Sequence, residues 1–211
     1  MTEAESTKNA AKSTKDAIEQ LKNRIKFLEK ENRKWMRLAG VNRLTELPNS
    51  LLLFQVGLPR ELGKGLDKPI SLSCILVCPD GLGDINQLHG RTVGDGLIKE
   101  VSTFVKTQVG SGEQLYHCDG SNFAILMPGA TEGVARRKAT GLKDQFKEEK
   151  FTVGTRQFDH LTCSVGVADI GGPIESARIA EYADQLYQQL CNSLYKAKEH
   201  GGDSVISSPK I

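Results

Sequence analysis

The chain has 211 residues, of which 38% are hydrophobic, so its length allows one domain with a sizeable core and a smaller appendage. The 28 Lys and Arg residues nearly balance the 26 Asp and Glu residues, and a formal net charge of +2 demands neither nucleic acid nor an anionic membrane as a partner. No stretch approaches the roughly 20 apolar residues of a membrane span, and the polar N-terminus lacks a signal peptide's apolar core. The five cysteines form no CxxC pair, which favours reduced thiols and a cytoplasmic location.

Residues 1–40 predict a disordered tail followed by a coiled-coil helix. Residues 1–15 are rich in Lys, Ser, Thr and Ala and are expected to be disordered. From Asp16 onward a heptad begins, with its core positions at Ile18, Leu21, Ile25, Leu28, Asn32, Trp35 and Ala39. Ile at a and Leu at d favour a parallel two-stranded coil, in which Asn32 at an a position would fix the register. The alternative is a lone amphipathic helix that lies on its own domain.

Residues 41–211 predict a second domain in which helices and strands alternate. After a turn-rich connector at 41–50, helices are expected at 51–62, 83–88, 92–108, 132–148 and 176–200. Strands are expected at 70–77, at 115–128 as a hairpin, at 151–156 and 161–170 as a second pair, and at 204–206. The turn Pro79-Asp80-Gly81 ends the first strand. This order predicts an α/β sandwich with a mixed, mostly antiparallel central sheet flanked by helices.

The hairpin Leu115–Pro128 is the strongest local signal, because Asp-Gly and Ser-Asn lie between two apolar runs. After the turn, residues 123–127 are apolar on both faces of the strand, which is typical of a central strand covered by a layer on each side. The turn is therefore expected at the edge of a buried sheet, where a site can be built.

Short fragments along the second domain share the order and spacing of a known family. They are Leu44-Thr45, Leu47-Pro48-Asn49, Ile85-Asn86, Gly90, Val93-Gly94-Asp95, Phe123–Leu126, Ser164–Ala168, Leu194-Tyr195, Ala197-Lys198 and Gly201. With them, about four-fifths of the chain resembles the GGDEF domain of diguanylate cyclases. The resemblance implies a sheet flanked by helices, as in nucleotidyl cyclases and polymerase palm domains. It also implies chemistry in which two domains, each with one GTP, form cyclic di-GMP with two divalent cations.

The resemblance assigns the metal ions to three carboxylates, and this sequence has other residues at all three positions. The first position falls on Cys78, a soft ligand unsuited to magnesium. The signature turn reads Asp119-Gly120-Ser121-Asn122-Phe123, so Ser121 and Asn122 stand where the family has acids. We therefore expect no metal site, no cofactor and no catalytic residues, which is the pattern of a degenerate pseudo-enzyme.

Further departures surround the expected site. Gly83 and Gly202 stand where the family has a lysine and an arginine that help to hold phosphates. The product-inhibition motif Arg-x-x-Asp falls on Gly110–Glu113, without the arginine that clamps a cyclic dinucleotide. The connector differs from the family's Asp, Gly and Arg, with Asn42, Glu46 and Ser50 in their place.

Part of a nucleotide pocket is retained. Asn86 and Asp95 match the side chains that read the guanine edge in the family, and an amide with a carboxylate suits the donors and acceptors of guanine. Lys198 matches a phosphate-facing lysine, and the backbone N–H groups of Gly81 and Leu82 suit a phosphate. Alternatively, Asn86 is a helix-turn amide, Asp95 an N-terminal cap and Lys198 a solvated lysine.

Three functions remain open at this point. The first is a catalytically inactive GGDEF-like module that regulates or scaffolds a protein partner, as a homodimer through its coil. The second is a non-catalytic receptor for GTP or another guanine nucleotide. The third is a diguanylate cyclase with an atypical metal site. The four histidines have no ligand spacing with Cys or carboxylates, so a zinc site is not expected.

Overall fold

The computed structural model describes residues 3–209, apart from the side chains of residues 3–14, 16, 33 and 37. The chain divides into two compact units, and the boundary in the sequence falls between Gly40 and Val41. Within the described residues, no helix is long and apolar enough to cross a membrane. All five cysteines are free thiols.

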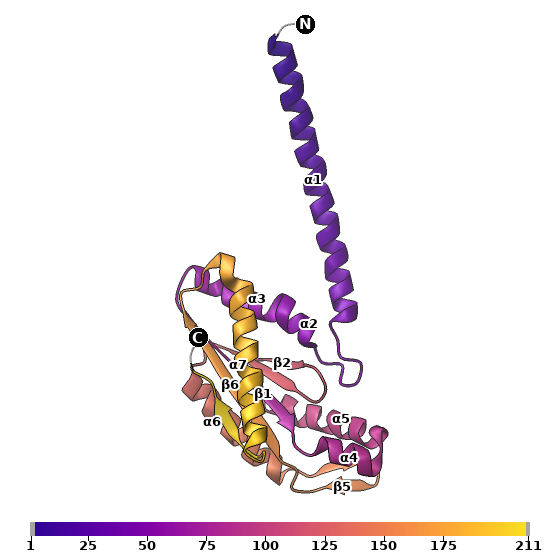
Figure 1. Ribbon diagram of the computed structural model, residues 1–211. Helices are drawn as coiled ribbons and strands as arrows, with labels where there is room; N and C mark the ends of the chain where they lie inside the picture. The colour runs from indigo at the N-terminus through magenta and orange to yellow at the C-terminus, as the bar shows by residue number, and fades with distance from the viewer. Residues whose placement is uncertain (1–2, 210–211) are drawn as a thin grey trace. The chain divides into compact units, whose positions relative to one another are not determined.

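The first unit is a single helix, α1 (Glu3–Ala39), shown in indigo in Figure 1. The helix starts at Glu3, which corrects the disordered tail expected for residues 1–15; residues 1 and 2 lie outside the described residues. The cause is composition, because residues 3–15 combine Ala, Glu and Lys with no Gly or Pro, and such residues favour a helix.

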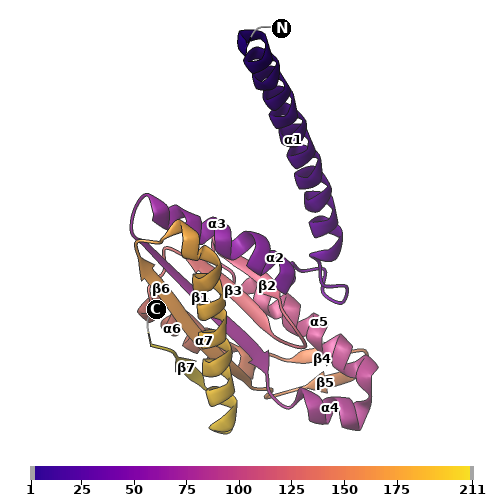
Figure 2. The ribbon, with the colours of Figure 1, turned by 45° about the horizontal axis from the view of Figure 1, so that its top comes forward.

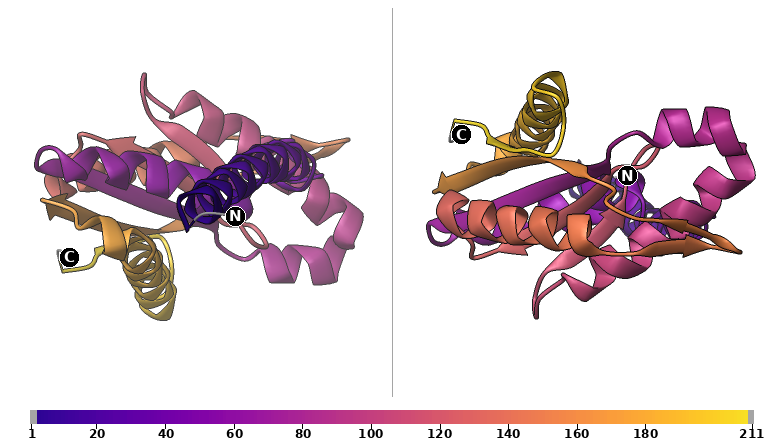
Figure 3. Two further views of the ribbon diagram at one scale, coloured as in Figure 1. Left: turned by 90° about the horizontal axis from the view of Figure 1, so that it is seen from above. Right: turned by 90° about the horizontal axis from the view of Figure 1, so that it is seen from below.

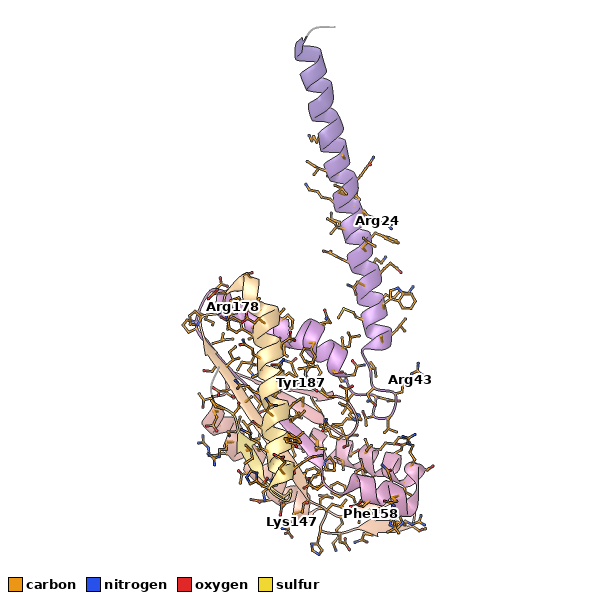
Figure 4. All side chains as sticks on the ribbon, in the orientation of Figure 1. Arg24, Arg43, Lys147, Phe158, Arg178 and Tyr187 are labelled. Carbon is orange, nitrogen blue, oxygen red and sulfur yellow. The ribbon has the colours of Figure 1, made fainter. Side chains whose placement is uncertain are left out.

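One stripe of α1 carries exposed apolar side chains at the heptad positions. Their exposed fractions lie between 47% and 63% for Ile18, Leu21, Ile25, Leu28 and Trp35. Outside this stripe, the guanidinium of Arg24 lies 5.3 Å from the centre of the Phe27 ring (Figure 4). The stripe is the apolar surface that a second helix would cover in a coiled coil.

The second unit is built on a five-stranded sheet in the order β2-β3-β1-β6-β7 (Figure 2). The strands are β1 (Ile70–Pro79), β2 (Gln114–His117), β3 (Phe123–Pro128), β6 (Cys163–Gly172) and β7 (Val205–Ser207). Every pair of neighbours is antiparallel except β6 and β7, which are parallel. The predicted mixed, mostly antiparallel sheet flanked by helices is confirmed.

Helices cover both faces of the sheet. Successive side chains of β1 point to opposite faces, so alternate residues pack against different helices. One face packs on α5 (Arg91–Thr107) and α6 (Glu132–Glu148), and receives Ile75 and Val77 of β1. The other face packs on α3 (Leu58–Gly63) and α7 (Ile179–Glu199), and receives the alternate residues of β1, which end with Cys78. Figure 3 shows α6 and α7 on opposite sides of the sheet.

The remaining elements connect these layers. The helical segment before α3 consists of α2 (Ser50–Leu52) and a π-helical turn (Leu53–Gly57), and α4 (Leu82–His89) directly follows β1. Short 3₁₀ turns at Lys64–Leu66 and Ser176–Arg178 complete the chain.

The second hairpin differs from its prediction. The expected pairing of 151–156 with 161–170 is wrong, because β4 (Phe151–Val153) pairs instead with β5 (Arg156–Phe158). A tight turn containing Gly154, at φ +62°, closes this hairpin after three residues. The longer run of β6 pairs with β1 over ten residues, which suits a strand that is buried on both faces.

Gly166 fixes the close approach of α7 to β6. A Cβ at this position would lie 2.5 Å from the carbonyl oxygen of Leu190 and 2.7 Å from the backbone nitrogen of Leu194. Only glycine therefore permits this helix–strand distance. The approach brings the last turns of α7 to the end of β1, where the site residues lie.

Candidate functional site

The end of β1 gathers three side chains that are remote in sequence. Cys78 points to the α7 side of the sheet and is 4% exposed. The ammonium group of Lys198, from the last turn of α7, donates to the Cys78 sulfur at 2.9 Å. The hydroxyl oxygen of Ser121 lies 3.3 Å from the same sulfur. The predicted residues Cys78, Ser121 and Lys198 are thus brought together around one thiol.

The hairpin turn Asp119–Asn122 reaches Cys78 because β3 pairs with β1, with Phe123 opposite Val77. The turn is closed by Gly120 at φ +66° and by a hydrogen bond from the Cys118 nitrogen to the Asn122 carbonyl, at 2.8 Å. Asp119 and Gly120 are exposed, whereas Ser121 and Asn122 are half-buried. The turn therefore lies beside the end of β1, with Ser121 in contact with Cys78.

His117 holds this turn in place through hydrogen bonds, a role that no sequence motif indicates. Its Nε2 lies 2.9 Å from the Gly120 carbonyl, which only accepts, so Nε2 carries the hydrogen and Nδ1 accepts from Thr45 Oγ1 at 2.8 Å. The ring stacks on Phe123 with centroids 4.5 Å apart. Burial lowers the pKa of His117, although its bond to the Gly120 carbonyl acts in the opposite direction. The sequence signal for this role is a polar imidazole ring, that of His117, at the end of a strand and directly after two hydrophobic residues.

Asp80 is a second residue whose role the sequence pattern does not indicate, since the pattern predicts only a turn at this position. Its Oδ1 accepts from Ser164 Oγ at 2.7 Å, and its Oδ2 accepts from Thr162 Oγ1 at 2.8 Å. The backbone nitrogen of Asp203 donates to Oδ2 as well, at 3.0 Å. Both carboxylate oxygens are thereby engaged in tying β1 to β6 and to the segment after α7.

Gly202 lies directly against Asp80. A Cβ at Gly202 would lie 2.9 Å from Asp80 Oδ2, and the φ of +76° belongs to the left-handed region that favours glycine. The backbone at this position is thus suited to glycine. Gly202, which follows the C-terminus of α7, packs against Asp80 just after β1.

Asn86 and Asp95 lie on the two helices that follow β1, which pack against each other. The Asn86 Oδ1 atom is buried and has no hydrogen-bond partner among the described residues. It lies against Gly94, where a Cβ would come within 1.8 Å of it. Asp95 follows Gly94 in α5 and is exposed. The two predicted guanine-reading residues therefore lie on two helices, α4 and α5, that pack against each other.

The alternative role of Asp95 as a helix cap is wrong. The N-cap of α5 is Gly90, and Asp95 lies in the second turn of the helix. At the start of α4, Gly81 is the N-cap, at φ +70°, and Leu82 is the first helical residue. Their N–H groups lie at the positive end of a helix, where an anion is favoured.

A family model described as "Diguanylate cyclase, GGDEF domain" matches residues 39–204. This chain belongs to the GGDEF domain family. The predicted family and its α/β fold are confirmed, with helix α1 preceding the domain.

Among curated relatives, diguanylate cyclase DosC of Escherichia coli K12 is 25% identical over 167 residues, covering 79% of this chain and 35% of DosC. Diguanylate cyclase DgcS of Shewanella oneidensis is 25% identical over 174 residues, covering 81% of this chain and 53% of DgcS. The chain spans between about a third and a half of the length of these relatives.

Solved structures share the fold of this GGDEF domain. The coiled coil and GGDEF domain of DgcB from Caulobacter crescentus, in complex with c-di-GMP, has a TM-score of 0.70 at 17% identity, covering 93% of this chain and 100% of that one. Diguanylate cyclase SiaD of Pseudomonas aeruginosa, in complex with its activator SiaC, has a TM-score of 0.67 at 19% identity, covering 97% and 78%. At these identities, the likeness establishes the fold alone.

Proposed function

We propose that this protein is a catalytically silent GGDEF domain that serves as a regulatory or scaffolding module. The observation that carries the proposal is the environment of Cys78, whose sulfur contacts the Lys198 ammonium and the Ser121 hydroxyl. The family's chemistry, as the resemblance implies it, needs carboxylate oxygens for two divalent cations at this place.

The residues present do not fit a magnesium ion. Magnesium prefers hard oxygen ligands, above all carboxylates, whereas the strand end offers a thiol, a hydroxyl and an ammonium that repels a cation. The carboxylate of Asp80 already accepts three hydrogen bonds. Among the described residues, no three His, Cys, Asp or Glu side chains are grouped to hold a metal ion.

The dimeric and partner-binding parts of the proposal rest on α1. Its exposed apolar stripe has the heptad spacing of a two-stranded coil, so a second copy of the helix would bury it. A neighbouring fold, SiaD, is found in complex with its activator, which supports protein–protein contact as a mode of control in this fold. A silent domain would act through such contacts alone.

The test is a product assay. The purified full chain is incubated with GTP and either Mg²⁺ or Mn²⁺, and cyclic di-GMP is sought by chromatography, with DosC as the positive control. We expect no product above a no-protein control. Product from the unmodified chain would overturn the proposal in favour of a diguanylate cyclase with an atypical metal site.

A second candidate function is a non-catalytic receptor for GTP or another guanine nucleotide. It is favoured by the buried Asn86 Oδ1, which has no partner among the described residues, because guanine offers a ring N–H and an exocyclic amine as donors. Calorimetric titration with GTP, GDP and cyclic di-GMP tests it. If none of the three nucleotides gives a heat of binding, the receptor function is wrong and the regulatory or scaffolding function is the one that remains.

A further inference from the structure

We infer that this site binds the phosphates of a guanine nucleotide without a divalent cation, with the Lys198 ammonium supplying the positive charge. The inference rests on the second candidate function and adds its ionic requirement. It follows from the mismatch between the donors at the end of β1 and a magnesium ion.

Lys198 keeps its charge available because its partner is a thiol. A carboxylate at position 78 would form an ion pair with the ammonium, whereas a thiol only accepts a hydrogen bond from it. Cys78 is buried and Lys198 is exposed, so the ammonium stands at the boundary between the strand end and solvent. From there it can meet an anion that approaches the domain.

Two carboxylates near the strand end, Asp80 and Asp203, are already engaged. Asp80 accepts from two hydroxyls and a backbone N–H. Asp203 pairs with Lys143 at 3.1 Å and with Lys147 at 2.7 Å, and Lys147 is labelled in Figure 4. Two further carboxylates, Asp84 on α4 and Asp119 in the hairpin turn, are exposed to solvent, which screens them.

The start of α4 adds to this anion site. Gly81 and Leu82 follow Cys78 by three and four residues and present N–H groups at the positive end of the helix. At Gly83 a Cβ would have no atom within 4 Å, so this side of the helix start is open to a ligand. A divalent cation at the Cys78 sulfur would instead have to displace the ammonium that now lies 2.9 Å away.

The experiment is calorimetric titration of the full chain with a non-hydrolysable GTP analogue, in Mg²⁺ and in EDTA. We expect the two Kd values to agree within about threefold, since the charge comes from the protein. Lys198→Met is expected to weaken binding about tenfold or more in EDTA, because hydrogen bonds to charged groups are worth that much. Lys196→Met is the matched control, since residues two apart on a helix do not share a face.

A second variant tests the role of the thiol. Cys78→Asp places a carboxylate beside Lys198, so binding in EDTA is expected to weaken and to recover in part when Mg²⁺ is added. Circular dichroism of each variant confirms that it is folded. Binding of the unmodified chain only in Mg²⁺ would overturn the inference and leave the receptor function intact. No binding in either buffer would overturn both, and equal losses in the two lysine variants would overturn the role of Lys198.

Discussion

Lys198 and Cys78 are 120 residues apart in the chain, yet their side chains meet, with the lysine nitrogen 2.9 Å from the cysteine sulfur. Cys78 lies near the end of the first strand and Lys198 in the last turn of the last helix, so the contact joins both ends of the GGDEF domain. The chemistry of this position is therefore defined jointly by residues from distant parts of the chain, Cys78, Ser121 and Lys198.

Repair of one position is expected to leave the protein without diguanylate cyclase activity. Cys78→Asp alone leaves Ser121 and Asn122 in the turn, and Ser121→Asp with Asn122→Glu leaves the strand end without its ligand. Even the triple variant lacks the phosphate-holding side chains replaced by Gly83 and Gly202, and groups that act as a unit are strongly non-additive. The measurement is cyclic di-GMP by chromatography after incubation with GTP and Mn²⁺. Turnover by the Cys78→Asp variant would contradict this expectation.

The full chain is expected to be a dimer through α1 at micromolar concentration. Leu21→Glu with Leu28→Glu places charge on the apolar stripe and should give a monomer in sedimentation velocity experiments. Asn23→Glu with Lys30→Glu changes two positions outside the heptad core and should leave the dimer intact. A monomeric unmodified chain would show that the exposed stripe has another use.

If a guanine nucleotide binds, Asn86→Ala and Asp95→Ala should each weaken it. The loss of one hydrogen-bond partner to a polar ligand typically costs about 1–3 kcal/mol. Calorimetry with GTP measures the change, and ATP serves as the comparison ligand. Equal affinity for ATP and GTP in the unmodified chain would mean that these two residues do not read a base.

Cyclic di-GMP is expected not to bind at the segment Gly110–Glu113. This segment has no arginine, and the Glu113 carboxylate already accepts from the Gly110 nitrogen at 2.6 Å and from Lys138. Titration with cyclic di-GMP should therefore give the same heats for the unmodified chain and for Glu113→Ala. Micromolar binding that is lost in Glu113→Ala would disprove this prediction.

Stability is expected to fall as the pH is lowered through the range in which a histidine titrates. Burial lowers the pKa of His117 in the folded state, so the unfolded chain binds a proton at a pH where the folded chain does not. Between the unfolded value near 6.5 and the lower folded value, unfolding takes up a proton, and the free energy of unfolding decreases as the pH falls.

Thermal unfolding from about pH 7.5 to 5.5 measures this effect. The fall in Tm should be smaller in His117→Gln than in the unmodified chain. The exposed His200 provides the control, since His200→Gln should keep the full pH dependence. Identical profiles for the His117 variant and the unmodified chain would show that another group is responsible.

The sequence by itself determined most of the local secondary structure and the family of the domain. An apolar run at 70–77 predicted a buried strand, and apolar residues on both faces of 123–127 predicted a central one. Glu132–Glu148 forms the helix that the sequence predicted. The order and spacing of the short fragments sufficed to indicate the family, which the family model over residues 39–204 confirms. Local pattern overstated disorder in residues 3–15, where helix propensity prevails.

Only the tertiary structure decided which strands pair and which side chains from distant segments come into contact. The sequence could not indicate that β6 pairs with β1 rather than with the strand at 151–156, because pairing depends on which buried faces meet. Nor could it indicate that Asp80 is engaged by Thr162, Ser164 and Asp203, or that His117 supports the turn. The Lys198–Cys78 contact depends on how closely α7 lies on the sheet at Gly166, a distance set by packing that no local pattern encodes.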